Sequence, residues 1–202
     1  MSGQAGADWV VVLVKDFDAA KQRLRPSLDS AQRRELAREN ARLALAAARA
    51  GDRVLAVCGS AEAGELARAA GAEALVEAAP SGQNPAARLG IGHAGANGAA
   101  SVLLLSSDLP LVTRRAVATM LAAGRRLGSP AALAAPATGR GGTNALYLRP
   151  PDAIGLHFGD DSLASFERDA AGRGVRFALH ESPRLALDLD EPSDLEELRR
   201  LA

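Results

Sequence analysis

The sequence is poor in cysteine and in aromatic residues, and it has no excess of one charge. Cys58 is the single cysteine among 202 residues, so no disulfide can form within the chain, and the cytoplasm is the expected compartment. Aromatic residues make up 3%, so we expect a core of small aliphatic side chains with Cys58 packed among them. Lys and Arg balance Asp and Glu at 24 each, so neither nucleic acid nor an anionic membrane is an expected partner.

Long hydrophobic runs and several catalytic signatures are also missing. The apolar stretch from Val10 to Val14 is far shorter than the roughly 20 residues that a bilayer requires. His93, His157 and His180 lack metal-ligand spacing, and no serine lies in a nucleophile-elbow pattern, which argues against zinc and hydrolase chemistry. The chain has neither a Walker A loop nor a GxGxxG fingerprint after the first apolar run, which argues against a kinase or a dehydrogenase.

Short apolar runs alternate with segments of helical periodicity, which is typical of βαβ units around a mostly parallel sheet. No repeat, linker or low-complexity segment interrupts them. We therefore predict a single α/β domain over residues 1–202, doubly wound and Rossmann-like, with helices on both faces of the sheet. Strands are expected at residues 9–14, 53–57, 74–76, 101–105, 131–135, 145–148, 175–179 and 185–189, with helices between most of them.

Acidic side chains lie at the ends of two predicted strands. In open α/β sheets ligands bind outside the carboxyl ends of the strands, and Asp108 is expected at such an end. Asp188 and Asp190 are one residue apart, so on a strand both carboxylates would point to one face, with Cα atoms about 7 Å apart. Because like charges repel, a divalent cation would relieve this pair, and oxygen ligands suit magnesium better than zinc. Alternatively, Asp108 and Asp190 only begin turns ahead of nearby prolines.

Basic residues follow the first predicted strand. Lys15, Lys21, Arg23 and Arg25 could hold a triphosphate, since lysine and arginine would offset the charge of a leaving pyrophosphate. Solvated loop charges are the alternative.

Two glycine-containing segments could hold a further anion. In the loop GRGGTN, residues 139–144, backbone amides can form an anion-binding concavity, and Thr143 adds a hydroxyl. Gly159 to Ser162 stand directly ahead of a predicted helix, where free amides and the helix dipole favour a phosphate or a carboxylate.

Five motifs run through nearly the whole chain: VLVKDFDAAKQRL, LLLSSDLPL, GRGGTNALYLRPP, HFGDDSLASF and SPRLALDLDEPSDL. In this order they resemble the 2-phospho-L-lactate guanylyltransferase family of deazaflavin coenzyme F(420) biosynthesis. The family lies in the nucleotide-diphospho-sugar transferase-like superfamily. The resemblance implies guanylyl transfer from GTP to 2-phospho-L-lactate, phosphoenolpyruvate or 3-phosphoglycerate, with release of pyrophosphate and with magnesium as cofactor.

The resemblance also implies roles for single residues. Asp108, Asp188 and Asp190 would be the catalytic metal ligands. The implied acceptor-binding residues are Thr143, Gly159 and Ser162, and the implied nucleotide-binding residues are Lys15, Lys21, Arg23, Ser81 and Asn84. A downstream transferase that accepts the product is an implied partner, and a homodimer is an open alternative.

Two departures from the family pattern keep other functions open. The acceptor loop reads GDDS where the family often has glycine, proline, glycine and serine, so Asp160 and Asp161 add negative charge near an anionic substrate. The glycine-rich start of the wider superfamily is replaced by Lys15 and its basic neighbours. Transfer to molybdopterin or to a sugar phosphate is one alternative, and a non-catalytic GTP-binding regulator is another.

Overall fold

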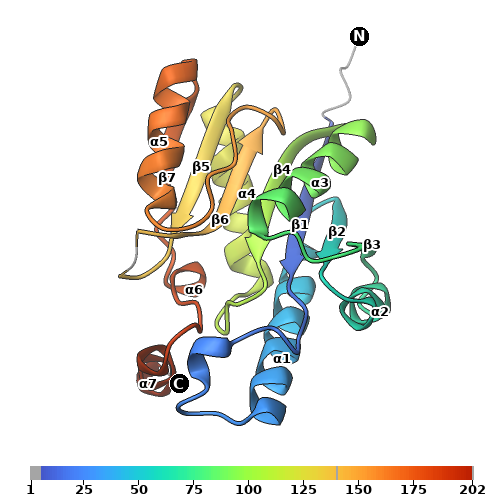
Figure 1. The fold of residues 1–202 in the computed structure, drawn as a ribbon. Helices are drawn as coiled ribbons and strands as arrows, with labels where there is room; N and C mark the ends of the chain where they lie inside the picture. The colour runs from blue at the N-terminus through green and yellow to red at the C-terminus, as the bar shows by residue number, and fades with distance from the viewer. Residues whose placement is uncertain (1–5, 140, 202) are drawn as a thin grey trace.

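The computed structural model describes residues 6–139 and 141–201. Within these residues the strands form one seven-stranded sheet in the order β3-β2-β1-β4-β6-β5-β7 (Figure 1). Only β6 runs antiparallel to its neighbours β4 and β5, so the predicted, mostly parallel α/β sheet is confirmed. The strands are β1 (Ala7–Val14), β2 (Arg53–Cys58), β3 (Glu73–Val76), β4 (Ala99–Ser106), β5 (Ala131–Pro136), β6 (Thr143–Arg149) and β7 (Arg176–Leu179).

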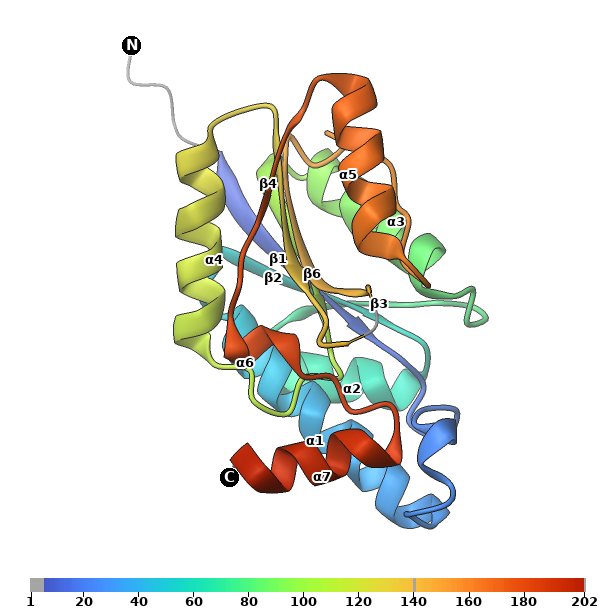
Figure 2. The ribbon, with the colours of Figure 1, turned by 90° about the vertical axis from the view of Figure 1, so that its left-hand side faces the viewer.

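Helices cover both faces of this sheet, as predicted (Figure 2). Residues of α1, α2 and α4 pack in one hydrophobic cluster, and residues of α3 and α5 pack in a second cluster on the opposite face. The helices are α1 (Ser30–Ala48), α2 (Ala61–Ala69), α3 (Gln83–Ala96), α4 (Arg114–Leu127), α5 (Ser162–Arg173), α6 (Pro183–Ala186) and α7 (Pro192–Leu201), with a 3₁₀ turn, η1 (Gln22–Leu24), after β1. None of the described helices is long and apolar enough to cross a membrane.

Local sequence explains why these elements form where they do. The side chains of β1 from Trp9 to Val14 are all buried, because a central strand of a sheet with helices on both faces has no exposed face. Each buried valine or leucine favours folding by about 1.5–3 kcal/mol through the hydrophobic effect. The side chains of Ser60 and Thr113 accept hydrogen bonds from the amide of the third residue of α2 and α4, so each caps the start of its helix.

The segment 185–189 is not the strand that we predicted. Pro183 begins a short helix, α6, that ends at Ala186, and the chain then runs extended without pairing to the sheet. Leu187 and Leu189 are nevertheless buried, so side chains still alternate along residues 187–190. Buried and partly exposed side chains do alternate along this segment, as they would on a strand. The backbone, however, forms no hydrogen-bonded ladder with the sheet.

The carboxyl ends of the parallel strands and the beginning of β6 meet at one edge of the sheet. Because β6 is antiparallel, its first residues, Thr143 and Asn144, lie at the edge where β4 ends. We had placed these two residues in a loop, but β6 begins at Thr143. The turn η1 and the helices α6 and α7 gather beyond this edge, at the bottom of Figure 1. Segments far apart in the chain therefore come together there.

Candidate active site

Two adjoining cavities open at the carboxyl edge of the sheet. The larger has a volume of about 400 Å³, and its polar walls include Lys15, Lys21, Arg23, Asp108, Thr143, Gly159, Asp160, Ser162, Asp188 and Asp190. The smaller has a volume of about 200 Å³ and is mainly aliphatic, with Leu13, Val14, Val57 and Ala86 among its lining residues. Lys15, Ala19, Gln83 and Ser106 line both cavities. The two cavities therefore adjoin, and one is polar while the other is apolar.

A buried ammonium group organises the floor of the larger cavity. Lys21 Nζ lies 2.7 Å from Asp108 Oδ1 and 4.0 Å from Asp190 Oδ1, and it donates a hydrogen bond to the Leu189 carbonyl at 2.6 Å. The Leu189 amide in turn donates to the Asp108 carbonyl at 3.1 Å. These contacts join three segments of the chain, and they place the carboxylates of Asp108 and Asp190 within 4.0 Å of the same ammonium group.

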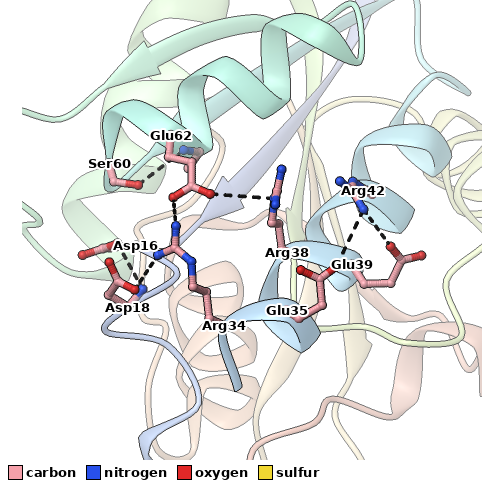
Figure 3. Close-up of polar contacts among 10 residues, drawn as sticks. Asp16, Asp18, Arg34, Glu35, Arg38, Glu39, Arg42, Ser60 and Glu62 are labelled. Atoms are coloured by element: carbon pink, nitrogen blue, oxygen red, sulfur yellow. Dashed lines mark hydrogen bonds and ion pairs between the residues drawn. The ribbon is translucent and has the colours of Figure 1, made fainter. Parts of the chain in front are cut away.

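The loop after β1 is what carries Lys21 into this position. Phe17 and Leu24 are buried and anchor the loop on both sides of Lys21, whose backbone is left-handed with φ 58°. At the surface, Arg34 of α1 pairs with Asp18 of this loop and with Glu62 of α2 (Figure 3). The loop is thus tied to two helices while it places the ammonium group under the sheet edge.

The charges of this group shift one another's proton affinity. Burial would raise the pKa of the Asp108 carboxyl, but Lys21 and Lys15 outweigh it and hold that pKa well below its ordinary value. Conversely, Asp108 raises the pKa of the Lys15 ammonium against the effect of burial, with smaller contributions from Asp190 and Asp188. All three carboxylates therefore act on one lysine at the mouth of the cavity, and the carboxyl of Asp108 stays ionised at neutral pH.

The three carboxylates that we predicted to hold a metal, Asp108, Asp188 and Asp190, line the same cavity. Their side chains are not arranged around one common point. No group of three His, Cys, Asp or Glu side chains in the described part of the chain has the geometry to hold an ion. Instead, Lys21 lies between Asp108 and Asp190. Asp108 and Asp190 supply carboxylate oxygens, the donor type that a divalent ion prefers, so the residues present fit such an ion in chemistry, while the Lys21 ammonium group balances their charge in this arrangement.

The opposite wall of the larger cavity contains the predicted acceptor residues. The Ser162 hydroxyl donates to Thr143 Oγ1 at 3.1 Å, which joins the first residue of α5 to the first residue of β6, and both side chains are buried. Gly159 has φ 135°, a conformation that favours glycine. Asp160 lines the same wall, so a negative charge faces any acceptor bound there. Arg140, in the predicted glycine loop, lies outside the described residues.

The other predicted nucleotide-binding residues have different positions. Lys15 lines both cavities, whereas Arg23 lines the larger one with a side chain that is 68% exposed and lies 3.7 Å from Glu191. Ser81 is exposed and is not among the residues that line either cavity. Asn84 exchanges two hydrogen bonds, at 2.9 and 2.8 Å, with the backbone of Phe158. Asn84 therefore ties the start of α3 to the residue ahead of Gly159.

Two residues that sequence reasoning missed hold the Asp188–Asp190 segment in place. Asn144 lines the cavity and donates from its side-chain amide to the carbonyls of Leu185 and Ala186, at 2.9 and 3.0 Å. The buried carboxylate of Asp194 accepts from the amides of Asp190 and Glu191, at 2.8 and 2.7 Å. Both lie inside the motifs quoted above, but only their contacts reveal this role.

A comparison with known families identifies the chain. Residues 9–199 match the profile described as "Guanylyl transferase CofC like". The chain belongs to this family. The predicted resemblance is thereby confirmed, and so is the nucleotidyltransferase class of the fold.

Members of the CofC-like family with curated names differ in the acid that they use. Phosphoenolpyruvate guanylyltransferase of Rubrobacter xylanophilus is 38% identical over 94% of this chain and 92% of its own length. 2-Phospho-L-lactate guanylyltransferase of Methanothermobacter thermautotrophicus is 32% identical over 93% of this chain and 82% of its own. 3-Phospho-D-glycerate guanylyltransferase of Colwellia psychrerythraea is 32% identical over 96% of this chain and 91% of its own length.

Solved structures confirm the fold of the CofC-like chain. A Desulfovibrio desulfuricans protein assigned as a nucleotide-diphospho-sugar transferase superposes with a TM-score of 0.77 at 20% identity, over 96% of this chain and 87% of that chain. Rv0371c of Mycobacterium tuberculosis, crystallised with manganese, has a TM-score of 0.56 at 16% identity, over 97% of this chain and 100% of that chain.

Proposed function

We propose that this protein transfers the guanylyl group of GTP to a small phosphorylated three-carbon acid and releases pyrophosphate, with magnesium as the cation. Phosphoenolpyruvate is the acceptor that we expect first, because the relative that uses it is 38% identical over most of both chains. 2-Phospho-L-lactate and 3-phosphoglycerate are the competing acceptors. We also propose that the product of this reaction is used in the biosynthesis of the deazaflavin coenzyme F(420).

The observation that carries this proposal is the group formed by Lys21, Asp108 and Asp190 on the floor of the larger cavity. It combines buried cationic and anionic groups with an open polar space of about 400 Å³, enough for phosphates and a small acid. The adjoining, mainly apolar cavity suits a nucleoside base.

The reaction that we propose needs no general base. An oxygen of the acceptor phosphate attacks the α-phosphorus of GTP, the bond from that phosphorus to the bridging oxygen breaks, and pyrophosphate leaves with the bonding electrons. A phosphate monoester has a second pKa near about 6, so it is already mostly ionised at pH 7. The remaining work is positioning and neutralisation of charge, which Lys15 and Lys21 supply from one side of the cavity.

Asp108, Asp188 and Asp190 are the residues that would hold magnesium. When bound, the ion would supply charge neutralisation at the transferred phosphoryl group and the leaving pyrophosphate. Thr143 and Ser162 would bind the acceptor with their hydroxyl groups, and the amides around Gly159 would face its phosphate or carboxylate at the start of α5. Lys15 and Arg23 would contact the triphosphate.

Replacement of a carboxylate tests the proposed catalytic role. Asp190→Asn is the informative variant, because the Asp190 side chain is 34% exposed and its loss leaves Lys21 paired with Asp108. We expect pyrophosphate release to fall by about 100-fold or more, since electrostatic groups at such sites contribute a few kcal/mol to the transition state. The unfolding midpoint should change little. Asp152→Asn, at an exposed position outside both cavities, is the matched control.

The substrate is tested by incubation of the protein with magnesium, GTP and each acid separately. Pyrophosphate is quantified and the adduct is identified by mass, with the downstream transferase added to trap an unstable product. Release of pyrophosphate with a sugar phosphate or molybdopterin, but with none of the three acids, would favour those alternative transferases. Binding of GTP without pyrophosphate release under any condition would favour the non-catalytic regulator. Asp160 and Asp161 are the reason for this alternative, because their negative charge would oppose binding of an anionic acceptor.

The proposed setting is the cytoplasm, where GTP and phosphorylated acids are available, and the single buried cysteine supports it. A downstream transferase that accepts the product and a second copy of the chain are the proposed protein partners. Analytical ultracentrifugation tests the homodimer.

A further inference from the structure

The smaller cavity is lined by acidic groups that the proposed reaction does not use. Glu77 follows β3 and lines this cavity, whose other walls are mainly aliphatic. Its backbone amide donates to the Cys58 carbonyl at 2.9 Å, which extends the pairing of β3 with β2 by one residue. The backbone of Glu77 is therefore fixed by the sheet, although the loop that follows it, rich in turn-forming residues, is exposed.

The carboxylate of Glu77 is also fixed. The Ser81 hydroxyl and, at 3.4 Å, the Ser81 amide both donate to Glu77 Oε1. A carboxylate has about four lone-pair positions, so these two bonds leave it able to accept further hydrogen bonds from a ligand. Ser81, which we had predicted to contact the nucleoside, thus acts on a residue that lines the cavity.

We propose that Glu77 reads the base of the nucleotide and selects guanine. This inference rests on the proposed function, because it assumes that the base occupies the smaller cavity while the phosphates occupy the larger one. Guanine has two adjacent donors, N1–H and the 2-amino group, which match the two oxygens of a carboxylate. Adenine has an acceptor at N1 and no amino group at C2, so a carboxylate repels it. Cytosine has acceptors, N3 and O2, at the two positions that correspond to the guanine donors.

A second carboxylate, Asp16, also lines the smaller cavity, but its position favours a different role. Asp16 is adjacent to Lys15, which lines both cavities, so it lies near the junction with the phosphate-binding space. Its Oδ1 accepts from the Asp18 amide at 3.2 Å within the loop after β1. Glu77 instead follows β3, does not line the larger cavity, and has a carboxylate held by Ser81. The two carboxylates therefore give a matched pair of variants.

The test is Glu77→Gln, measured by titration of wild type and variant with GTP, ITP, XTP and ATP in the presence of magnesium. Because the glutamine amide can accept from N1–H and donate to the 2-carbonyl of xanthine, we expect affinity for GTP to fall by about 10- to 100-fold and affinity for XTP to rise. Ser81→Ala should weaken the preference for GTP over ITP in the same direction. Asp16→Asn and the exposed Glu65→Gln should keep the base preference of the wild type.

Binding, and not turnover, is the readout, so failure of guanylyl transfer does not decide this proposal. An unchanged preference for GTP in Glu77→Gln would overturn it, and so would a switch toward XTP in Asp16→Asn. If Glu77→Gln does not fold, Ser81→Ala decides, and an unchanged ratio of GTP to ITP affinity would then count against Glu77. A wild-type protein that binds ATP as tightly as GTP would also overturn the proposal.

Discussion

The most consequential single residue in the site is Lys21. Its side chain is 1% exposed, and its ammonium group contacts a carboxylate and a carbonyl, whereas the Lys15 side chain, which also pairs with Asp108, is 58% exposed. A buried charge that loses its partner is far more costly than an exposed one. The two lysines therefore contact the same carboxylate but should differ in their effect on stability.

We predict that Lys21→Met lowers the free energy of unfolding by about 3 kcal/mol, because Asp108 would stay buried with only its exposed partner. Lys15→Met should lower it by less than about 1 kcal/mol. Urea denaturation at pH 7 followed by circular dichroism measures both. Equal effects of the two substitutions would mean that burial of Lys21 does not strengthen its pairing with Asp108.

Single residues were predicted well where their chemistry follows from neighbours in the chain. Cys58 is buried as expected, and burial raises the pKa of its thiol to about 11. Lys15, Lys21 and Asp108 line one cavity, as their positions after β1 and β4 suggested. The role of Ser81 and Asn84 as nucleoside contacts stays a prediction, and the structure adds that Ser81 contacts Glu77 and that Asn84 contacts the backbone of Phe158.

At the scale of elements, α5 is tied to the segment before the acceptor loop. Asp169 of α5 accepts hydrogen bonds from the Gly155 amide at 2.6 Å, from His157 Nε2 at 2.9 Å and from Arg173 Nε at 2.5 Å. His157 and Arg173 hold the pKa of the Asp169 carboxyl at about 2. One carboxylate thus fixes the chain two residues ahead of Gly159.

We predict that Asp169→Asn lowers stability at pH 7 by about 1 kcal/mol, a value discounted for the solvent around this pair. Because the pKa is depressed in the folded state, the contribution is complete above pH 4 and is lost as the pH falls through about 2. The difference between wild type and variant, measured by thermal unfolding from pH 6 to pH 2, should therefore shrink at the acidic end. Glu167→Gln, exposed on the same helix, is the control. A difference that stays constant with pH would contradict the ionic role.

Elements were predicted better than their connections. The strands that become β1 to β7 were all expected within a few residues, because buried parallel strands are apolar throughout and helices have a different period. The prediction of a strand at residues 185–189 was wrong, because an alternating pattern shows which side chains are buried but not whether the backbone pairs with a neighbouring strand. Pro183 was the available signal, since proline favours the first turn of a helix.

For the whole molecule, the site exists only when the sheet is complete. Its residues come from the segments after β1 and β4, from the start of β6 and α5, and from the stretch between α6 and α7. A ligand that bridges these segments binds the folded state and not the unfolded chain. Ligand binding should therefore stabilise the entire fold in one cooperative step.

We predict that GTP with magnesium, at about 100 times its dissociation constant, stabilises the protein by about 2.7 kcal/mol. For a chain of this size the midpoint of thermal unfolding should rise by roughly 5–10 °C. Differential scanning calorimetry with and without chelator measures the shift. The Asp190→Asn variant should show a smaller shift if this carboxylate holds the cation, and an identical shift in both proteins would count against that role.

The sequence by itself determined the α/β class, the mostly parallel sheet and the family, because periodicity, burial and motif order are local properties that the chain carries in linear form. The tertiary structure decided that Lys21 lies between Asp108 and Asp190, that Asn144 and Asp194 hold the 185–190 segment, and that Ser81 contacts Glu77. The contacts of Lys21 and Asn144 join residues between 41 and 169 positions apart in the chain. Their distances depend on how whole elements pack, which no local pattern encodes.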